Sequence, residues 1–257
     1  GLDDKVLTDQ NGLALEGLAW VARASGEARH AAAVRELATV LADRHSAGGL
    51  LRLPGLPAVV TDYGALACGL LAAFDLLGDP ALVGRAAAVV DEAVSRLAAD
   101  DGGFYTAPAG RADLVRRGRE HLDNAWPSGE AQLAVAAARL HHLTGARRWR
   151  DIAAGAVSAA AGMASRAPAN AATILHAATL LTDGVVAVAT GSGTLAAPCR
   201  RWHGRNVHIV PLSTCAPTGW ACLDGRSSIA DEQLLVCRGT ECLLPARTPA
   251  EALQRLA

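Results

Sequence analysis

The chain has 257 residues, of which 51% are hydrophobic and 19% are charged, and its formal net charge is -1. Basic and acidic residues almost balance, which argues against a nucleic acid or an anionic membrane surface as the main partner. No apolar run approaches the ~20 uncharged residues that a membrane span requires, so the composition favours a soluble protein without a membrane partner.

The first two thirds of the chain have the pattern of paired helices. Apolar runs at 13–24, 66–77, 133–143 and 174–181 predict buried inner helices. The segments 28–44 and 80–98 carry apolar residues on one face only, which predicts amphipathic outer helices. Gly26, Gly78 and Gly145 follow three of the inner runs, as glycines do at helix C-termini. The sequence therefore predicts a mainly α fold, a partial α/α toroid of helical hairpins over residues 1–183.

The pattern changes near Asp183. Short apolar runs at 185–189, 207–210 and 234–237 predict strands. Thr248 and Glu251 form a capping pattern, which predicts a last helix at about 249–256. We therefore predict that residues 184–257 form a small α/β appendage on the helical domain.

Two cysteine pairs lie in this appendage, at positions 215 and 222 and at positions 237 and 242. Their spacing leaves three alternatives open, namely reduced thiols, a disulfide and a structural zinc site. We favour reduced thiols with no bound metal or cofactor, because no secretory signal precedes the first motif and a reducing cytoplasm is the expected location.

Acidic side chains stand close before three of the inner helices, at Asp9, Asp62 and Asp123. In a toroid the starts of equivalent inner helices face one funnel, so we expect these carboxylates to line a shared cavity. Paired carboxylates suit general acid–base chemistry on a sugar, which makes Asp62 and Asp123 candidate catalytic residues. The competing explanation is that each aspartate only caps a helix N-terminus.

A long charged loop precedes the third inner run. His121 is a third candidate catalytic residue because its reference pKa lies near neutrality, although a packing role is the competing explanation. Arg117, Arg119 and Glu120 either bind an anionic group of a ligand or form a network that fixes the loop. The other candidate substrate-binding residues carry polar or flat aromatic side chains near the same helix starts; they are Asp9, Asn11, Tyr63, Asn124, Trp126 and Ser128.

Aromatic residues make up only 4% of the chain, which favours a small ring over a long glycan as the ligand. Tyr63 and Trp126 lie near the proposed rim of the cavity. Trp20 and Trp149 are instead expected to pack between helices.

Four motifs resemble the YyaL-like family, also called the spermatogenesis-associated, thioredoxin-domain-containing family. They are DKVLTDQNGL at 4–13, DY at 62–63, RGREHLDNAWPSG at 117–129 and VCRGTEC at 236–242. The resemblance implies a six-hairpin α/α toroid related to sugar epimerases and hairpin glycosidases, with a thioredoxin-like domain normally in the same polypeptide. The chain departs from the family at Gln10, where tryptophan is usual, and at Glu130 and Ala131, which replace Asn-Ser.

Two functions remain open at this point. The first is binding of, or action on, a small carbohydrate, as an isomerase, an epimerase or a glycosidase-like enzyme. The second is a non-catalytic scaffold for a thioredoxin-like domain or another partner, or an incomplete fragment of such a protein. The chain begins at Gly1 inside a motif and contains no Cys-x-x-Cys, so we expect it to be part of a longer protein.

Overall fold

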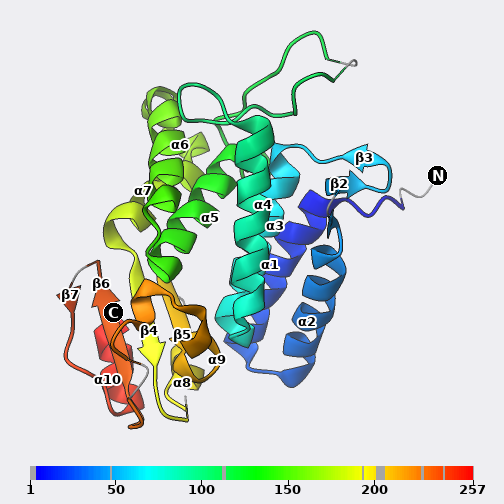
Figure 1. Cartoon of the computed structure of the whole chain (residues 1–257). Coiled ribbons are helices and arrows are strands. Elements are labelled where there is room, and N and C mark those ends of the chain that lie inside the picture. Colours follow the sequence, from blue (N-terminus) through cyan, green and yellow to red (C-terminus); the bar gives the residue numbers. More distant parts are fainter. Residues whose placement is uncertain are drawn as a thin grey trace.

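The structure is a computed structural model that describes residues 4–46, 48–111, 114–192, 194–200, 206–226, 229–239 and 241–256. Its helices form an array of hairpins, with the strands of the C-terminal part at one end (Figure 1). The inner helices are α1 (Thr8–Ser25), α3 (Val60–Leu77), α5 (Gly129–Thr144) and α7 (Ala172–Asp183). The outer helices are α2 (Ala28–Ala42), α4 (Pro80–Leu97) and α6 (Arg147–Arg166). The predicted mainly α fold with a partial toroid of hairpins is thus confirmed.

Glycines end the first three inner helices, as the sequence predicts. Gly26, Gly78 and Gly145 follow α1, α3 and α5 with φ angles of 68°, 69° and 75°. A side chain with a Cβ is strained in this left-handed region, which is why glycine is common there. The chain can therefore turn back at once into the next outer helix.

Helix α3 packs between α1 and α5, and nearly all of its side chains are buried. Among the described residues it is the one helix long and apolar enough to cross a membrane, but 83% of that span is buried inside the fold. The helix contains Asp62 and Asp75, so it is not a run of ~20 uncharged apolar residues. Burial between its neighbours accounts for its apolar composition.

A small antiparallel sheet between α2 and α3 was not predicted from the sequence. It has the strand order β1-β2-β3. The strands are very short, and Pro57 lies in the last of them, so the sequence carries little strand signal there. The sheet matters because β2 brings Arg52 to the starts of α1 and α3. The strands are β1 (His45–Ser46), β2 (Gly49–Leu53) and β3 (Leu56–Pro57).

The C-terminal part contains a second sheet with the order β5-β4-β6-β7, in which β4 is parallel to β5 and antiparallel to β6. Its strands are β4 (Val185–Ala189), β5 (Val207–Pro211), β6 (Leu234–Arg238) and β7 (Glu241–Cys242). Short helices complete this part; they are α8 (Ala196–Arg200), α9 (Leu212–Cys215), η2 (Ala216–Thr218), η3 (Ala221–Leu223) and α10 (Pro249–Leu256). The predicted strands, last helix and α/β character are confirmed.

Both faces of this sheet are covered. Val186, Val188 and Val210 join the core of the helical part. Ala187 and Ile209 face the other way and form a second core with α8 and α10. Burial on both faces explains why these strands read as continuous apolar runs. Because one core extends from the helices into the sheet, the division of the chain at 183 stays a prediction.

The state of one cysteine pair differs from the sequence prediction. Cys237 and Cys242 form a disulfide, where reduced thiols were favoured. They face each other across the β6–β7 ladder, a contact that sequence spacing alone does not reveal. Cys222, in the other pair, is a free thiol. Within the described ranges, no group of three or more His, Cys, Asp or Glu side chains could hold a metal ion.

Candidate ligand-binding cavity

The first two predicted acids meet at the starts of α1 and α3, and Arg52 lies between them. The Nη1 of Arg52 lies 2.9 Å from Oδ2 of Asp9 and 3.1 Å from both carboxylate oxygens of Asp62. Asp62 is fully buried and accepts the backbone N–H groups of Asp9 and Val59, at 3.0 Å and 2.9 Å. Burial raises the pKa of Asp62, and the hydrogen bond from Val59 and the charge of Arg52 oppose that shift. These contacts fix the helix starts in place.

Asp123, the third predicted acid, is bonded to two other helix starts. Its Oδ1 accepts the N–H of Ser128 at 2.9 Å, and its Oδ2 accepts the N–H of Thr173 at 2.8 Å. Ser128 is the N-cap of α5 and accepts the N–H of Ala131. Asp123 therefore ties α5 to α7, and no contact described here joins it to Asp9 or Asp62.

The charged loop is anchored by Glu130 in the first turn of α5. The Nδ1 of His121 lies 2.8 Å from its Oε2, and the Nη2 of Arg119 lies 3.4 Å from its Oε1. Arg119 also bonds Asp101. Burial raises the pKa of the Glu130 carboxyl, while His121 and Arg119 counteract that shift. Of the three residues expected to form a loop-fixing network, Arg119 belongs to this one, with Glu130 as its acid, whereas Arg117 bonds the Ala107 carbonyl and Glu120 bonds Asn124.

The other predicted site residues lie in separate local contacts. Tyr63 is buried and donates to Glu92 at 3.0 Å, so it does not line a rim. Arg117 donates to the carbonyl oxygen of Ala107. The remaining contacts are those of Asn11 with the Leu7 carbonyl and of Asn124 with Glu120, while Trp126 is 56% exposed. Whether any of these side chains contacts a substrate stays a prediction.

The helix starts are too closely packed to form the predicted funnel between α3 and α5. A Cβ added to Gly129 would lie 2.5 Å from the backbone nitrogen of Thr61, and one on Gly64 would lie 2.6 Å from the carbonyl oxygen of Gly129. Such distances show that the two backbones touch where these glycines face each other. Space between the inner helices opens further along them.

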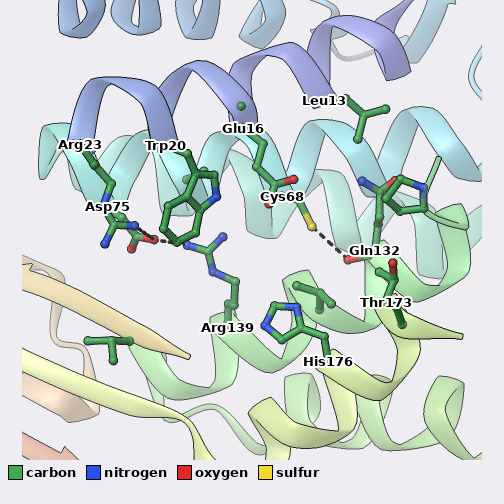
Figure 2. A pocket seen from close by; sticks show the side chains of 16 residues that line it. Leu13, Glu16, Trp20, Arg23, Cys68, Asp75, Gln132, Arg139, Thr173 and His176 are labelled. Carbon is green, nitrogen blue, oxygen red and sulfur yellow. Dashed lines mark hydrogen bonds and ion pairs between the residues drawn. The ribbon is translucent and has the colours of Figure 1, made fainter. Parts of the chain in front are cut away.

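A cavity of about 320 Å³ lies there, on the inner faces of α1, α3, α5 and α7 (Figure 2). The cavity is therefore enclosed by the inner helices of the hairpin array. Asp9, Asp62 and Asp123 are not among its lining residues. Its lining residues are Leu13, Glu16, Gly17, Trp20 and Arg23 of α1, Cys68, Ala72 and Asp75 of α3, Gln132, Val135 and Arg139 of α5, Ala172, Thr173 and His176 of α7, Pro127 and Val207.

Two polar side chains of this lining have unused hydrogen-bonding capacity. Within the described part of the chain, no hydrogen bond or ion pair holds the Glu16 carboxylate or the Gln132 side-chain amide. Figure 2 shows Glu16 and Trp20 extending from α1 towards Arg139 and His176 on the opposite wall. The indole of Trp20 lies under the Arg23 guanidinium, 4.5 Å from the ring centroid, and is only partly buried. Trp20, which we expected to serve only helix packing, therefore contributes a flat apolar surface to the cavity.

One end of the cavity is a buried ionic cluster around Asp75. Its Oδ2 lies 2.5 Å from Nη2 of Arg139 and 3.9 Å from Nη1 of Arg23. Its Oδ1 lies 3.6 Å from Nδ1 of His208 in β5. Burial alone would raise the pKa of Asp75, but Arg139, His208 and Arg23 together hold it below its usual value. The cluster links the helical array to the C-terminal sheet.

We expect the protein to lose stability below neutral pH because of His208. The pKa of this imidazole is lowered to about 4, mainly by burial; the contact with Asp75 opposes the shift, and the charges of Arg139 and His142 add to it. The unfolded chain, with a histidine pKa of ~6.5, takes up the proton first. The contribution of the neutral His208 to the free energy of unfolding is therefore fully present above pH ~6.5 and is lost as the pH drops towards 4. Between pH 7 and pH 5 the loss is about 2 kcal/mol.

Urea unfolding of the wild type and of His208→Gln at several pH values measures this loss. The variant should show a smaller loss of unfolding free energy between pH 7 and pH 5. A residual loss is expected from His142, whose pKa burial also lowers. An identical pH dependence in both proteins would show that His208 is not the group responsible.

Sequence reasoning missed the cavity, although a signal was present. Cys68 and Asp75 are seven residues apart in α3, and Gln132 and Arg139 are seven apart in α5. Seven residues are about two helical turns, so the two members of each pair lie on one face of the helix, and the residues between them are apolar or glycine. Polar residues at this spacing in buried helices indicate that the helices face a polar space.

Comparisons with known proteins concern the fold. No family model and no curated protein matches the sequence. The chain is similar to an inactive variant of the alpha-1,6-mannanase GH76A of Salegentibacter sp. HEL1_6 in complex with alpha-1,6-mannotriose, with 14% identity and a TM-score of 0.48. A second inactive variant, in complex with alpha-1,6-mannotetrose, has 15% sequence identity and a TM-score of 0.47. The GH76A alpha-1,6-mannanase itself has 16% identity and a TM-score of 0.47. Each match covers 60% of this chain and 47% of the mannanase chain, so the chain spans about half the length of these proteins.

Proposed function

We propose that the protein binds a small carbohydrate in the cavity between α1, α3, α5 and α7. The observation that carries this proposal is the lining of the cavity. Trp20 offers a flat apolar surface, and Glu16 and Gln132 offer hydrogen-bonding groups not used within the described fold. A sugar ring needs both, since it has apolar faces and a rim of hydroxyl groups. The volume of about 320 Å³ is at the small end of the range for ligand sites, which suits one or two rings.

The charges of the lining favour a neutral ligand. Glu16 and Asp75 carry negative charges, and Arg23 and Arg139 carry positive ones, so these groups balance. Asp75 is already ion-paired with Arg139. Glycoside hydrolysis commonly uses two carboxylates placed on either side of the scissile bond. With Asp75 engaged, Glu16 is the one acid of the lining that is available, which supports binding over hydrolysis.

Replacing Gln132 with leucine should weaken sugar binding at least tenfold, or ~1.4 kcal/mol. The change keeps the volume of the side chain but removes its donor and acceptor, so the hydroxyl groups they bind lose their partners. Isothermal titration calorimetry with a panel of neutral mono- and disaccharides measures the affinity. Gln10→Leu is the matched control, because it makes the same change at the exposed start of α1, outside the cavity.

Two results would contradict the proposal. One is that no sugar in the panel binds the wild type. The other is that Gln10→Leu weakens binding while Gln132→Leu does not, which would place the ligand at the helix starts. Far-UV circular dichroism and thermal unfolding of each variant check that the fold is intact.

A non-catalytic scaffold is the second candidate function, and the placement of the predicted acids favours it. Asp9, Asp62 and Asp123 each hold helix starts together, so none needs a substrate to account for its contacts. We further propose, on the sequence alone, that the chain is related to the YyaL-like proteins, works beside a thioredoxin-like domain and resides in the cytoplasm. Sequencing the reading frame upstream of Gly1 tests the relation, since a Cys-x-x-Cys domain is expected there.

A further inference from the structure

Outside the cavity, the disulfide of the C-terminal sheet lies against an arginine. The Nη2 of Arg226 is 2.8 Å from Sγ of Cys237 and 3.1 Å from Sγ of Cys242. Its Nη1 donates to the carbonyl oxygen of Cys222 at 2.9 Å, which holds the guanidinium in place. A permanent positive charge therefore touches both sulfurs of the disulfide.

The two sulfur-bearing residues differ in their access to solvent. Cys237 is in β6 and is only 9% exposed. Cys242 is in β7, the edge strand of the sheet, and is exposed. A nucleophile from solvent therefore reaches Cys242 without any opening of the core, and attack there makes Cys237 the leaving group. A leaving thiolate next to a cation is stabilised, which speeds thiol–disulfide exchange.

We propose that Cys237 and Cys242 form a thiol–disulfide exchange site that is reduced by an external dithiol, with Arg226 as the residue that stabilises the leaving thiolate. In the first step a thiolate of the dithiol attacks Sγ of Cys242. A mixed disulfide forms, the Cys237–Cys242 bond breaks, and Cys237 leaves as a thiolate beside Arg226.

In the second step the other thiol of the reductant attacks the reductant's own sulfur in the mixed disulfide, and Cys242 is released. Two electrons pass from the dithiol to the cysteine pair, so the dithiol becomes a disulfide. The two protons that the dithiol loses are balanced by those that the two cysteine thiolates take up. This activity is independent of the sugar-binding cavity.

Reduction of the folded chain by dithiothreitol at pH 7.5 tests the proposal. Samples are quenched with iodoacetamide at set times, and mass spectrometry of the peptides measures the alkylated fraction of both cysteines. We expect the wild type to be reduced with its circular dichroism unchanged, and Arg226→Gln to be reduced about tenfold more slowly. Arg226→Lys keeps the charge and should restore part of the rate. Arg247→Gln, which removes an exposed arginine elsewhere in the same part of the chain, should react as the wild type does.

A second measurement identifies which of the two sulfurs the external thiolate attacks. Glutathione, which has a single thiol, should leave its adduct on Cys242. An adduct on Cys237, a disulfide that is reduced only after unfolding, or equal rates for the wild type and Arg226→Gln would each overturn the proposal.

Discussion

Replacing Asp75 with asparagine is expected to lower the free energy of unfolding by about 3–5 kcal/mol. Asp75 is the carboxylate between two arginines, and Arg23 and Arg139 are only 4% and 6% exposed. The neutral variant leaves the charge of Arg139 in the core without this counter-charge, and a buried uncompensated charge is costly. Urea unfolding at pH 7.5 gives the value.

The control for this variant is Asp91→Asn. Asp91 pairs with Arg148 on the surface, where the two side chains are 45% and 58% exposed. Exposed pairs contribute ~1 kcal/mol or less, so the control should be close to the wild type. The double variant with Asp75→Asn and Arg139→Met should lose less unfolding free energy than the two single variants lose together. Equal losses for Asp75→Asn and Asp91→Asn would contradict the role given to the buried cluster.

Gly129→Ala is expected to lower the free energy of unfolding by about 3 kcal/mol, even though alanine has a higher helix propensity than glycine. Its Cβ would lie 2.5 Å from the nitrogen of Thr61 and 2.6 Å from the carbonyl carbon of Val60, so α3 and α5 must separate. Gly64→Ala strains the same contact from the other side. Because either change already parts the helices, the double variant should lose less than the sum of the single losses.

Gly84→Ala in α4 is the matched control, since no atom lies within 4 Å of a Cβ added there. It should stabilise the protein by about 0.5–1 kcal/mol, because alanine has the higher helix propensity. Thermal and urea unfolding measure both effects. A neutral or stabilising Gly129→Ala would mean that α3 and α5 are further apart than described, and the funnel at the helix starts would again be open.

The helical hairpins could be predicted because their signals are local. The apolar run of α3 can be recognised within a short stretch of sequence, and so can the C-terminal glycines at positions 26, 78 and 145. The sheet that carries Arg52 was missed because two of its three strands, β1 and β3, have only two residues each. Strands of that length leave no periodicity to recognise.

The site was harder to predict because one residue type serves two purposes. An aspartate before a helix looks the same whether it caps the helix or faces a ligand. What distinguishes these roles is a distant partner, such as Arg52 for Asp62 or Thr173 for Asp123. The Cys237–Cys242 disulfide likewise depends on strand pairing. Glu130 entered the sequence interpretation only as a departure from a motif, yet it anchors the charged loop.

Fluorine NMR of the protein labelled with 5-fluorotryptophan distinguishes a ligand site between the inner helices from one at the helix starts. Trp20→Phe and Trp126→Phe assign the two decisive resonances. On addition of a sugar that binds in calorimetry, we expect the Trp20 resonance to shift and that of Trp126, exposed near the helix starts, to stay in place. A shift of the Trp126 resonance with the Trp20 resonance unchanged would show that the sugar binds beside Asp123 and its neighbours, outside the cavity.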